Sequence, residues 1–318
     1  MNIEMNNKLP EFNAEIGKEF DYQSVYLKKR HSRLTIMFVV FLFLGAGFID
    51  LGLREQIPLT LGLLFTFLSL LFYWYKNHIN SNEQWTYTRV VAESIKSEWF
   101  KYISGGGDYP CNKKIGEEYY KELFISNIED KVAEYRDNII RATGKPIEFK
   151  INVDPTTKEY RSYSFDDRIE IYKKNRIEDQ LKWYEQKTLF MEKREKIYRT
   201  FFYTIVLIGM IFGGLKYFGI GIGNINLINN SDWFSIAVAL AFALENISGF
   251  FQYERLAINY KKSASDLRES LKKITSLEND VRSDENVFSE FVEDVENRIS
   301  NEHKSWSLTT SSKNIAKI

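Results

Sequence analysis

Four apolar segments constrain the fold of this chain more than any other feature. They cover residues 34–53, 59–75, 200–219 and 233–251. Helical segments of about 17 to 25 residues are long enough to cross a bilayer. The mean hydropathy of the whole chain is only -0.33, because charged segments separate the apolar ones. The sequence therefore predicts an all-α membrane protein whose four transmembrane helices form two hairpins.

The two halves of the chain repeat one plan. Each half has a basic helical lead-in, an apolar segment, a short connection, a second apolar segment and a continuing amphipathic helix. The stretch LKKRHSRLTIMFVVFLFLGA in the first half is similar in pattern to MEKREKIYRTFFYTIVLIGM in the second. We interpret this as an internal repeat of a two-span unit. The alternative is two unrelated hairpins that share only generic helical periodicity.

The repeat predicts the domain organisation. A flexible N-terminal segment at residues 1–21 precedes a first two-span unit at 22–104. A cytoplasmic insertion at 105–165 follows, and residues 166–318 form a second two-span unit that ends in a C-terminal helix.

Two stretches of the insertion indicate local structure. Alternating apolar residues from Ile147 to Val153, a turn at Asp154-Pro155 and the β-prone residues 160–165 permit a small β-hairpin at 145–165. The glycine run at 105–107 follows a helix and lacks the GxxxxGK[ST] pattern of a phosphate loop. We interpret this run as a flexible loop.

Amphipathic periodicity predicts long cytoplasmic helices, each with one buried face. After the second apolar segment the spacing is coiled-coil-like, at Trp85, Thr88, Ala92, Ile95, Trp99 and Tyr102. After the fourth it continues at Tyr260, Ala264, Leu267, Leu271 and Ile274. The last helix has an apolar face of Phe288, Phe291, Val295, Ile299 and Trp306. Within the second apolar segment, a stripe suited to close helix packing contains Gly62, Thr66, Ser69 and Tyr73.

Basic residues predict the orientation of the spans. Lysine and arginine cluster where the apolar segments adjoin the long helices, whereas the two short connections carry only Arg54 and Lys216. By the positive-inside rule, both termini and the central segment are cytoplasmic. The first thirty residues contain no apolar region of signal-peptide type. We expect a multi-pass protein of the cell (inner) membrane without a cleavable signal peptide.

Glu245 is the one acidic residue within the fourth apolar segment. On a helix it lies opposite a face of large apolar residues. Its own face carries small and polar residues, Ala237, Ala241, Ser248 and Gln252. An ionised carboxylate in hydrocarbon costs several kcal/mol, so this face requires another helix or water.

Two interpretations of Glu245 stay open. It is a candidate pore-lining group, one per subunit in an acidic ring, or a protonated or paired carboxylate that holds the helices together. Lys216 is a poor partner because it lies near the outer end of its helix. Asn246 and Ser248 satisfy the carboxylate only in part.

The other apolar segments carry three more candidate residues. Asp50 lies one turn before Arg54, so we expect an interfacial ion pair. Gly209 and Gly213 form a GxxxG pair, which we interpret as a packing surface rather than a hinge.

The sequence carries no signature of catalysis or of a cofactor. GxSxG, HExxH, paired CxxC and Walker patterns are absent. The single cysteine, Cys111, excludes an intrachain disulfide, and the three histidines are too scattered for a metal site. The 43 basic residues balance 43 acidic ones, so bulk charge does not indicate nucleic acid. We expect neither an enzyme nor a cofactor, metal or nucleic-acid partner.

With these residues in place, the chain resembles the SLATT family of bacterial two-transmembrane effectors, as a tandem pair. The resemblance rests on a span pair followed by QWTYTRVVAESIKSEWFKYISGGGDYP, and on the C-terminal FVEDVENRISNEHKSW. It implies a membrane effector of conflict systems such as antiphage defence, in which a cytoplasmic sensor triggers pore formation and host-cell death. It also implies a nucleotide-dependent sensor as partner, which this chain does not visibly contain.

Two functions fit these patterns. In the first, homo-oligomers in the bilayer use the polar faces of their spans to line a path once the cytoplasmic helices move. In the second, the spans anchor a scaffold whose coiled-coil-like helices recruit a partner through Leu267 and Leu271.

Overall fold

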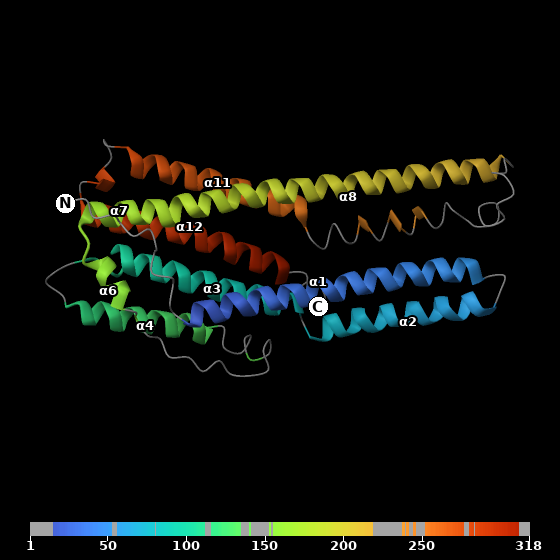
Figure 1. The fold of residues 1–318 in the computed structure, drawn as a ribbon, viewed down its shortest axis with the longest axis horizontal. Coiled ribbons are helices and arrows are strands. Elements are labelled where there is room, and N and C mark those ends of the chain that lie inside the picture. The colour runs from blue at the N-terminus through green and yellow to red at the C-terminus, as the bar shows by residue number, and fades with distance from the viewer. Residues whose placement is uncertain are drawn as a thin grey trace. The chain divides into compact units, whose positions relative to one another are not determined.

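The computed structural model describes residues 15–52, 56–79, 81–111, 116–134, 140, 153, 155–218, 237–238, 240–241, 244–245, 252–276, 280–282 and 284–311. Every regular element in these ranges is helical (Figure 1). In chain order the elements are α1 (Glu15–Gly52), α2 (Gln56–His78), α3 (Ser81–Ser104), α4 (Glu117–Glu134), α6 (Pro155–Arg161), α7 (Phe165–Tyr172), the π-helix η1 (Lys173–Glu178), α8 (Asp179–Tyr217), α11 (Tyr253–Thr275), the 3-10 helix η2 (Asp280–Arg282) and α12 (Glu285–Ser311).

The chain forms two compact units. Unit 1 comprises Met1–Lys28, Ser81–Gln186 and Asn259–Ile318, and unit 2 comprises Lys29–Asn80 and Lys187–Ile258. The boundaries fall within α1, α8 and α11, so each of these helices contributes residues to both units. Unit 2 contains the apolar segments, and unit 1 contains most of the amphipathic helices.

Unit 2 makes the chain a membrane protein. Three helical stretches are each long and apolar enough to cross a membrane: Glu19–Ile49 within α1, Pro58–His78 within α2, and Phe165–Tyr217, which includes α8. Large apolar side chains on them are exposed, for example Met37, Leu63 and Phe201, which lipid favours and water does not. The prediction of an all-α membrane protein is therefore confirmed. Residues 233–251 lie mostly outside the described part of the chain, so the fourth span stays a prediction.

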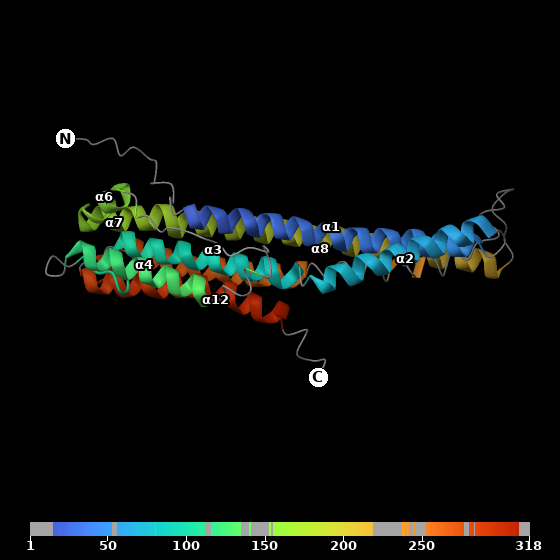
Figure 2. The same ribbon diagram turned by 90° about the horizontal axis from the view of Figure 1, so that it is seen from below.

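The first two membrane helices pack closely. α1 and α2 lie side by side in both views (Figure 1 and Figure 2). The hydroxyl of Ser69, which is 0% exposed, donates a hydrogen bond of 2.9 Å to the carbonyl oxygen of Phe38. A Cβ atom at Gly62 would lie 2.6 Å from the backbone nitrogen of Ile49. The predicted packing stripe of the second apolar segment is thus confirmed at Gly62 and Ser69.

Unit 1 is built around α3, which contacts α4, α6, α7 and α12. The predicted inner faces are buried. On α3 they are Trp85, Thr88, Ala92, Ile95, Trp99 and Tyr102. On α11 and α12 they include Tyr260, Ala264, Leu267, Ile274, Phe288, Phe291, Val295 and Ile299. The three- and four-residue spacing of apolar residues therefore identified the packed face of each helix correctly.

The structure corrects the β-hairpin expected at 145–165. Its first arm lies outside the described residues, but Pro155–Arg161 forms α6 and Phe165 begins α7. Proline suits the first position of a helix, and the Ser164 hydroxyl caps α7 by accepting a hydrogen bond from the amide of Asp167 at 3.3 Å. These helix-start signals outweigh the strand preference of residues 160–165.

The glycine run is not the flexible loop that we expected. Gly105 has a φ of 79° and ends α3 as a left-handed cap, and the amide of Gly106 donates to the carbonyl of Lys101 at 2.8 Å. The amide of Gly107 donates to the carbonyl of Ser289 at 3.1 Å. The glycines thus form an ordered turn that allows α12 to approach, because larger residues would occupy its space.

Candidate functional site

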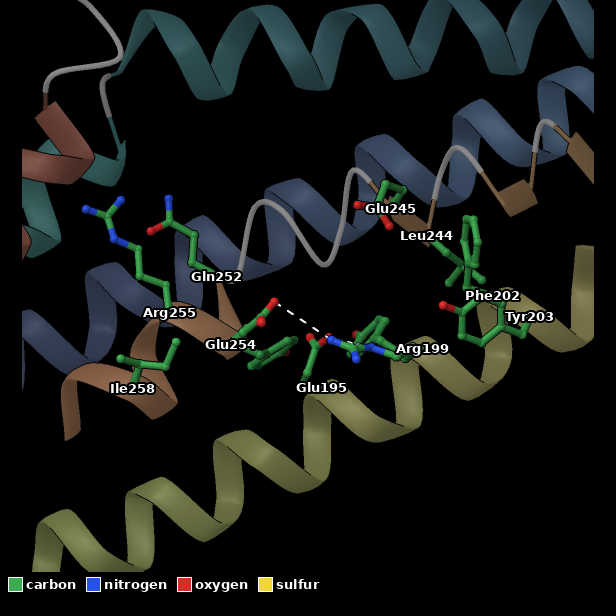
Figure 3. A pocket seen from close by; sticks show the side chains of 12 residues that line it. Glu195, Arg199, Phe202, Tyr203, Leu244, Glu245, Gln252, Glu254, Arg255 and Ile258 are labelled. Atoms are coloured by element: carbon green, nitrogen blue, oxygen red, sulfur yellow. Dashed lines mark hydrogen bonds and ion pairs between the residues drawn. The ribbon is translucent and has the colours of Figure 1, made fainter. Parts of the chain in front are cut away.

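A cleft of about 560 Å³ lies in unit 2. One side of the cleft is formed by α8, and the other side is formed by residues 244–245 and the start of α11 (Figure 3). Its lining combines carboxylates, arginines and aromatic rings, from Glu195, Tyr198, Arg199, Phe202, Tyr203, Leu244, Glu245, Gln252, Tyr253, Glu254, Arg255 and Ile258. Such a lining suits water and ions better than acyl chains.

Glu245 lies at this cleft beside Leu244 (Figure 3), and its side chain is exposed. Ala237 and Ala241 share its predicted face and are 7% and 6% exposed. This face is therefore covered by protein at the alanines and opens at the glutamate. The carboxylate of Glu245 is thus left uncovered by the described residues at the cleft.

An ion pair links the two sides of the cleft. The Nη2 atom of Arg199 on α8 lies 2.8 Å from Oε1 of Glu195 and 3.8 Å from Oε2 of Glu254 on α11. The rings of Tyr198 and Tyr253 stack beside this contact with their centroids 5.3 Å apart. Because the Arg199 side chain is 54% exposed, this bridge contributes little to stability and can separate readily.

Gln252, which lines the cleft just before α11, has an unusual backbone conformation. Its φ is 50°, a left-handed value that is unusual for a residue other than glycine. The carbonyl of Gln252 accepts the hydrogen bond of the Leu256 amide at 2.9 Å, in the first turn of α11. Left-handed geometry at a residue with a side chain is often found at functional sites.

The other predicted site residues whose side chains are described do not line this cleft. Lys216 is exposed in the last turn of α8, Gly209 is buried and Gly213 is half-buried. Asp50 belongs to α1, but its side chain is outside the described set. Asn246 and Ser248 also lie outside the part of the chain that the structure describes. Among the predicted residues with described side chains, Glu245 alone lines the cleft.

Sequence reasoning missed a buried polar cluster in unit 1, which we call the ion-pair node: Ser97, Tyr172, Arg176 and Glu296. The guanidinium of Arg176 donates to both oxygens of Glu296, from Nε at 2.8 Å and from Nη2 at 2.6 Å. Ser97 and Tyr172 donate to the same carboxylate at 2.6 Å and 3.0 Å. The side chains of Arg176 and Glu296 are 1% and 0% exposed.

One signal could have revealed half of the node. Glu296 follows Val292 by four residues and precedes Ile299 by three, which places it on the apolar face of α12. A carboxylate at such a position requires a partner. The sequence alone does not identify that partner, because Arg176 lies 120 residues earlier.

A second polar network fastens α4 to α3. The hydroxyl of Tyr109 donates to Glu98 at 2.6 Å and accepts from the amide of Asn127 at 2.7 Å. Lys131 lies 3.2 Å from the other oxygen of Glu98. Burial, together with the charge and hydrogen bond of Glu98, raises the pKa of Tyr109 well above its ordinary value. Tyr109 therefore acts as a neutral donor at physiological pH.

Comparisons with known proteins agree with this architecture. Residues 18–169 match the model of the SMODS and SLOG-associating 2TM effector domain 3. Residues 172–306 match the model of the SMODS and SLOG-associating 2TM effector domain 1. Searches of curated proteins and of solved structures find no significant match. The two matches confirm the tandem arrangement, and the first includes the whole segment 105–165 that was expected to be an insertion.

Proposed function

Because the chain belongs to the SLATT family and carries two of its effector domains in tandem, we propose that it is a pore-forming effector of a bacterial antiphage or other conflict system. In this proposal a cytoplasmic signal opens a path for ions across the inner membrane. The loss of ion gradients then kills or arrests the host cell. No catalytic turnover is required.

The cleft at Glu245 is the observation that carries this proposal. It places a carboxylate from within the fourth apolar segment in a polar cavity beside a membrane-spanning helix. Acidic groups at such places attract cations and select them over anions. A residue with a purely structural role would instead be enclosed by hydrogen-bonding partners.

The lipid-facing helices support assembly into a homo-oligomer. A path for ions has to be enclosed by protein on all sides, because backbone and polar side chains are not stable against acyl chains. Four spans provide few polar surfaces of their own. Several copies arranged as a ring would bring one Glu245 from each subunit toward a shared path.

The trigger is expected to act from the cytoplasm. By the positive-inside rule, the termini and the amphipathic helices lie there. Unit 1 would then receive the signal, from a nucleotide-dependent partner or through its own rearrangement. Helices α1, α8 and α11 contribute residues to both units, so a change in unit 1 has a covalent route to unit 2.

A membrane-potential assay in bacterial cells tests this function. Full expression of the wild type, with its genetic neighbours present to supply the trigger, is expected to depolarise the cells. Glu245→Gln should reduce the depolarisation. Glu290→Gln is the matched control, because it removes an exposed carboxylate from α12. Cells that keep their potential on full expression of the wild type would contradict the proposal.

The scaffold alternative loses one of its expected contacts. Leu267 is 2% exposed and packs within unit 1, so it does not present a surface to a partner. Leu271 is only half-buried. A Glu245→Gln variant with wild-type behaviour, combined with a captured cytoplasmic protein, would restore the scaffold as the better explanation.

A further inference from the structure

The ion-pair node joins the two SLATT domains within unit 1. Ser97 lies on α3, inside the first domain match, whereas Tyr172, Arg176 and Glu296 belong to the second. α12 closes the second domain, yet its main packing partner is α3 of the first. The hydrogen bond from Ser97 to Glu296 spans 199 residues of sequence. The node is therefore a fastening point between domains.

The geometry of the node favours two discrete states. Glu296 accepts hydrogen bonds from Ser97 and Tyr172 and two from Arg176, all at 3.0 Å or less. A shift of α12 by a few ångströms would break all of them together. Both charges then require water, because a half-separated pair in a dry interior is strongly unfavourable. The node is thus either closed and dry or open and hydrated.

Stability alone does not account for a charged pair at this position. Apolar residues of similar volume often stabilise a core as well as a buried ion pair does. If α12 moves away from α3, water hydrates the separated charges of Arg176 and Glu296. Apolar residues exposed in the same way would not be stabilised by water. Arg176 also retains a buried Nη1 atom without a hydrogen-bond partner among the described residues.

The backbone at Arg176 is also unusual. The residue lies in η1, a π-helix of six residues. Such turns are rare and are found frequently at functional sites. η1 continues directly into α8, which contains the third apolar segment, and α3 follows α2 after a short connection. Ser97 and Arg176 therefore lie on elements that connect directly to the second and third apolar segments, whereas Glu296 lies on the terminal helix α12.

A glycine contact holds α12 at a neighbouring point. A Cβ atom at Gly106 would lie 2.3 Å from Cγ1 of Val292, and the hydroxyl of Ser289 donates to the carbonyl of Gly107 at 3.3 Å. Val292 precedes Glu296 by one helical turn. The glycine contact and the node thus hold adjacent turns of the same face of α12.

We propose that the ion-pair node is a latch that holds α12 on α3, and that its opening is the cytoplasmic step that controls conduction. The second part rests on the function proposed above. Closed, the latch keeps the tandem domains together. Open, it frees α12 and the helices that lead into the spans.

Graded variants of the full chain test the latch. Ser97→Ala and Tyr172→Phe each remove one neutral donor and keep the ion pair. The double variant Arg176→Met with Glu296→Leu replaces the pair by apolar groups. Asp294→Asn is the control, because it removes a carboxylate from the exposed pair with Arg298 on the same helix. Hydrogen–deuterium exchange of α12 and potassium efflux from phosphatidylglycerol-containing vesicles are measured for each protein.

The single variants are expected to speed α12 exchange about tenfold, as the loss of a hydrogen bond to a charged group predicts, and to raise potassium efflux. The apolar double variant should slow both α12 exchange and potassium efflux, and the Asp294→Asn control should match the wild type. Unchanged α12 exchange in both single variants would overturn the latch. If the single variants show faster α12 exchange but unchanged potassium efflux, in vesicles through which the wild type conducts, the latch does not control conduction. If no protein conducts, the proposed pore fails, and α12 exchange alone decides the latch.

Discussion

The turn residue Gly106 packs directly against Val292 of α12. A Cβ atom at Gly106 would lie 2.3 Å from Cγ1 and 2.6 Å from Cβ of Val292. Gly106→Ala is therefore expected to displace α12 and to lower the free energy of unfolding by about 1–3 kcal/mol, the usual cost of overpacking. Thermal unfolding of the detergent-solubilised protein measures this loss.

A swap across the same contact serves as the control. Val292→Gly removes all three atoms nearest to the added Cβ, so Gly106→Ala should cost less in that background than in the wild type. Gly116→Ala should be nearly neutral, because no described atom lies within 4 Å of its added Cβ. Additive losses for the two substitutions would show that Gly106 and Val292 do not share this contact.

The close approach of α1 and α2 depends on Gly62. Its added Cβ would meet the backbone nitrogen of Ile49 at 2.6 Å, and backbone cannot move aside as a flexible side chain can. Gly62→Val is expected to separate the two helices and to lower the melting temperature clearly. Gly47→Val on α1 is the matched control, since no described atom lies within 4 Å there. Equal melting temperatures for the two variants would argue against the packed hairpin.

Arg161 organises the end of α3 through its planar guanidinium. Nη1 donates to the carbonyl of Tyr102 and, at 3.2 Å, to that of Tyr109, while Cζ lies 4.5 Å from the ring centroid of Tyr102. Arg161→Lys keeps the charge but loses the fork and the stacking. We expect a loss of about 1–3 kcal/mol in the free energy of unfolding. Lys158→Met, at a side chain that is 53% exposed, should change stability little in the same measurement.

Alkaline pH is expected to destabilise unit 1 through Tyr102. Burial, which outweighs the opposing charge of Arg161, raises the pKa of Tyr102 from 10.0 to about 12, with smaller contributions from Glu117, Glu118 and Cys111. Below pH 10 the phenol is protonated in both the folded and the unfolded chain. Between pH 10 and about 12 it ionises only in the unfolded chain, so stability falls over that window.

A titration of unfolding free energy against pH checks this expectation. Tyr102→Phe should remove part of the slope between pH 10 and 12, by about 2–3 kcal/mol over the window, and leave the curve below pH 9 nearly parallel to that of the wild type. Tyr73→Phe, in unit 2, is the comparison. Identical slopes for the wild type and Tyr102→Phe would contradict the assignment.

Periodicity predicted the helices and their buried faces well, because burial within one helix repeats every three or four residues. It placed Ile95 and Leu267 inside unit 1, and both are buried. It also singled out Glu245, since one carboxylate in an apolar run conflicts with its surroundings. These conclusions depend only on residues that are close together in the sequence.

Contacts between distant residues were beyond the same reasoning. In the sequence, Arg176 and Glu296 look like ordinary charged residues of amphipathic helices. Only the fold brings them into contact, because they are 120 residues apart. The glycine turn was misread for the same reason, because Val292 lies far along the sequence. Residues 160–165 were misread because helix caps and the contacts of Arg161 outweigh strand preference.

Ion selectivity of the purified full chain in a planar bilayer tests the central claim most directly. Under a potassium chloride gradient, and with the purified products of its genetic neighbours added to supply the trigger, the wild type is expected to conduct with a reversal potential that favours potassium. Glu245→Gln should move that potential toward zero, whereas Glu290→Gln should leave it unchanged. A wild type that does not conduct, or a reversal potential that Glu245→Gln leaves in place, would contradict a path lined by Glu245.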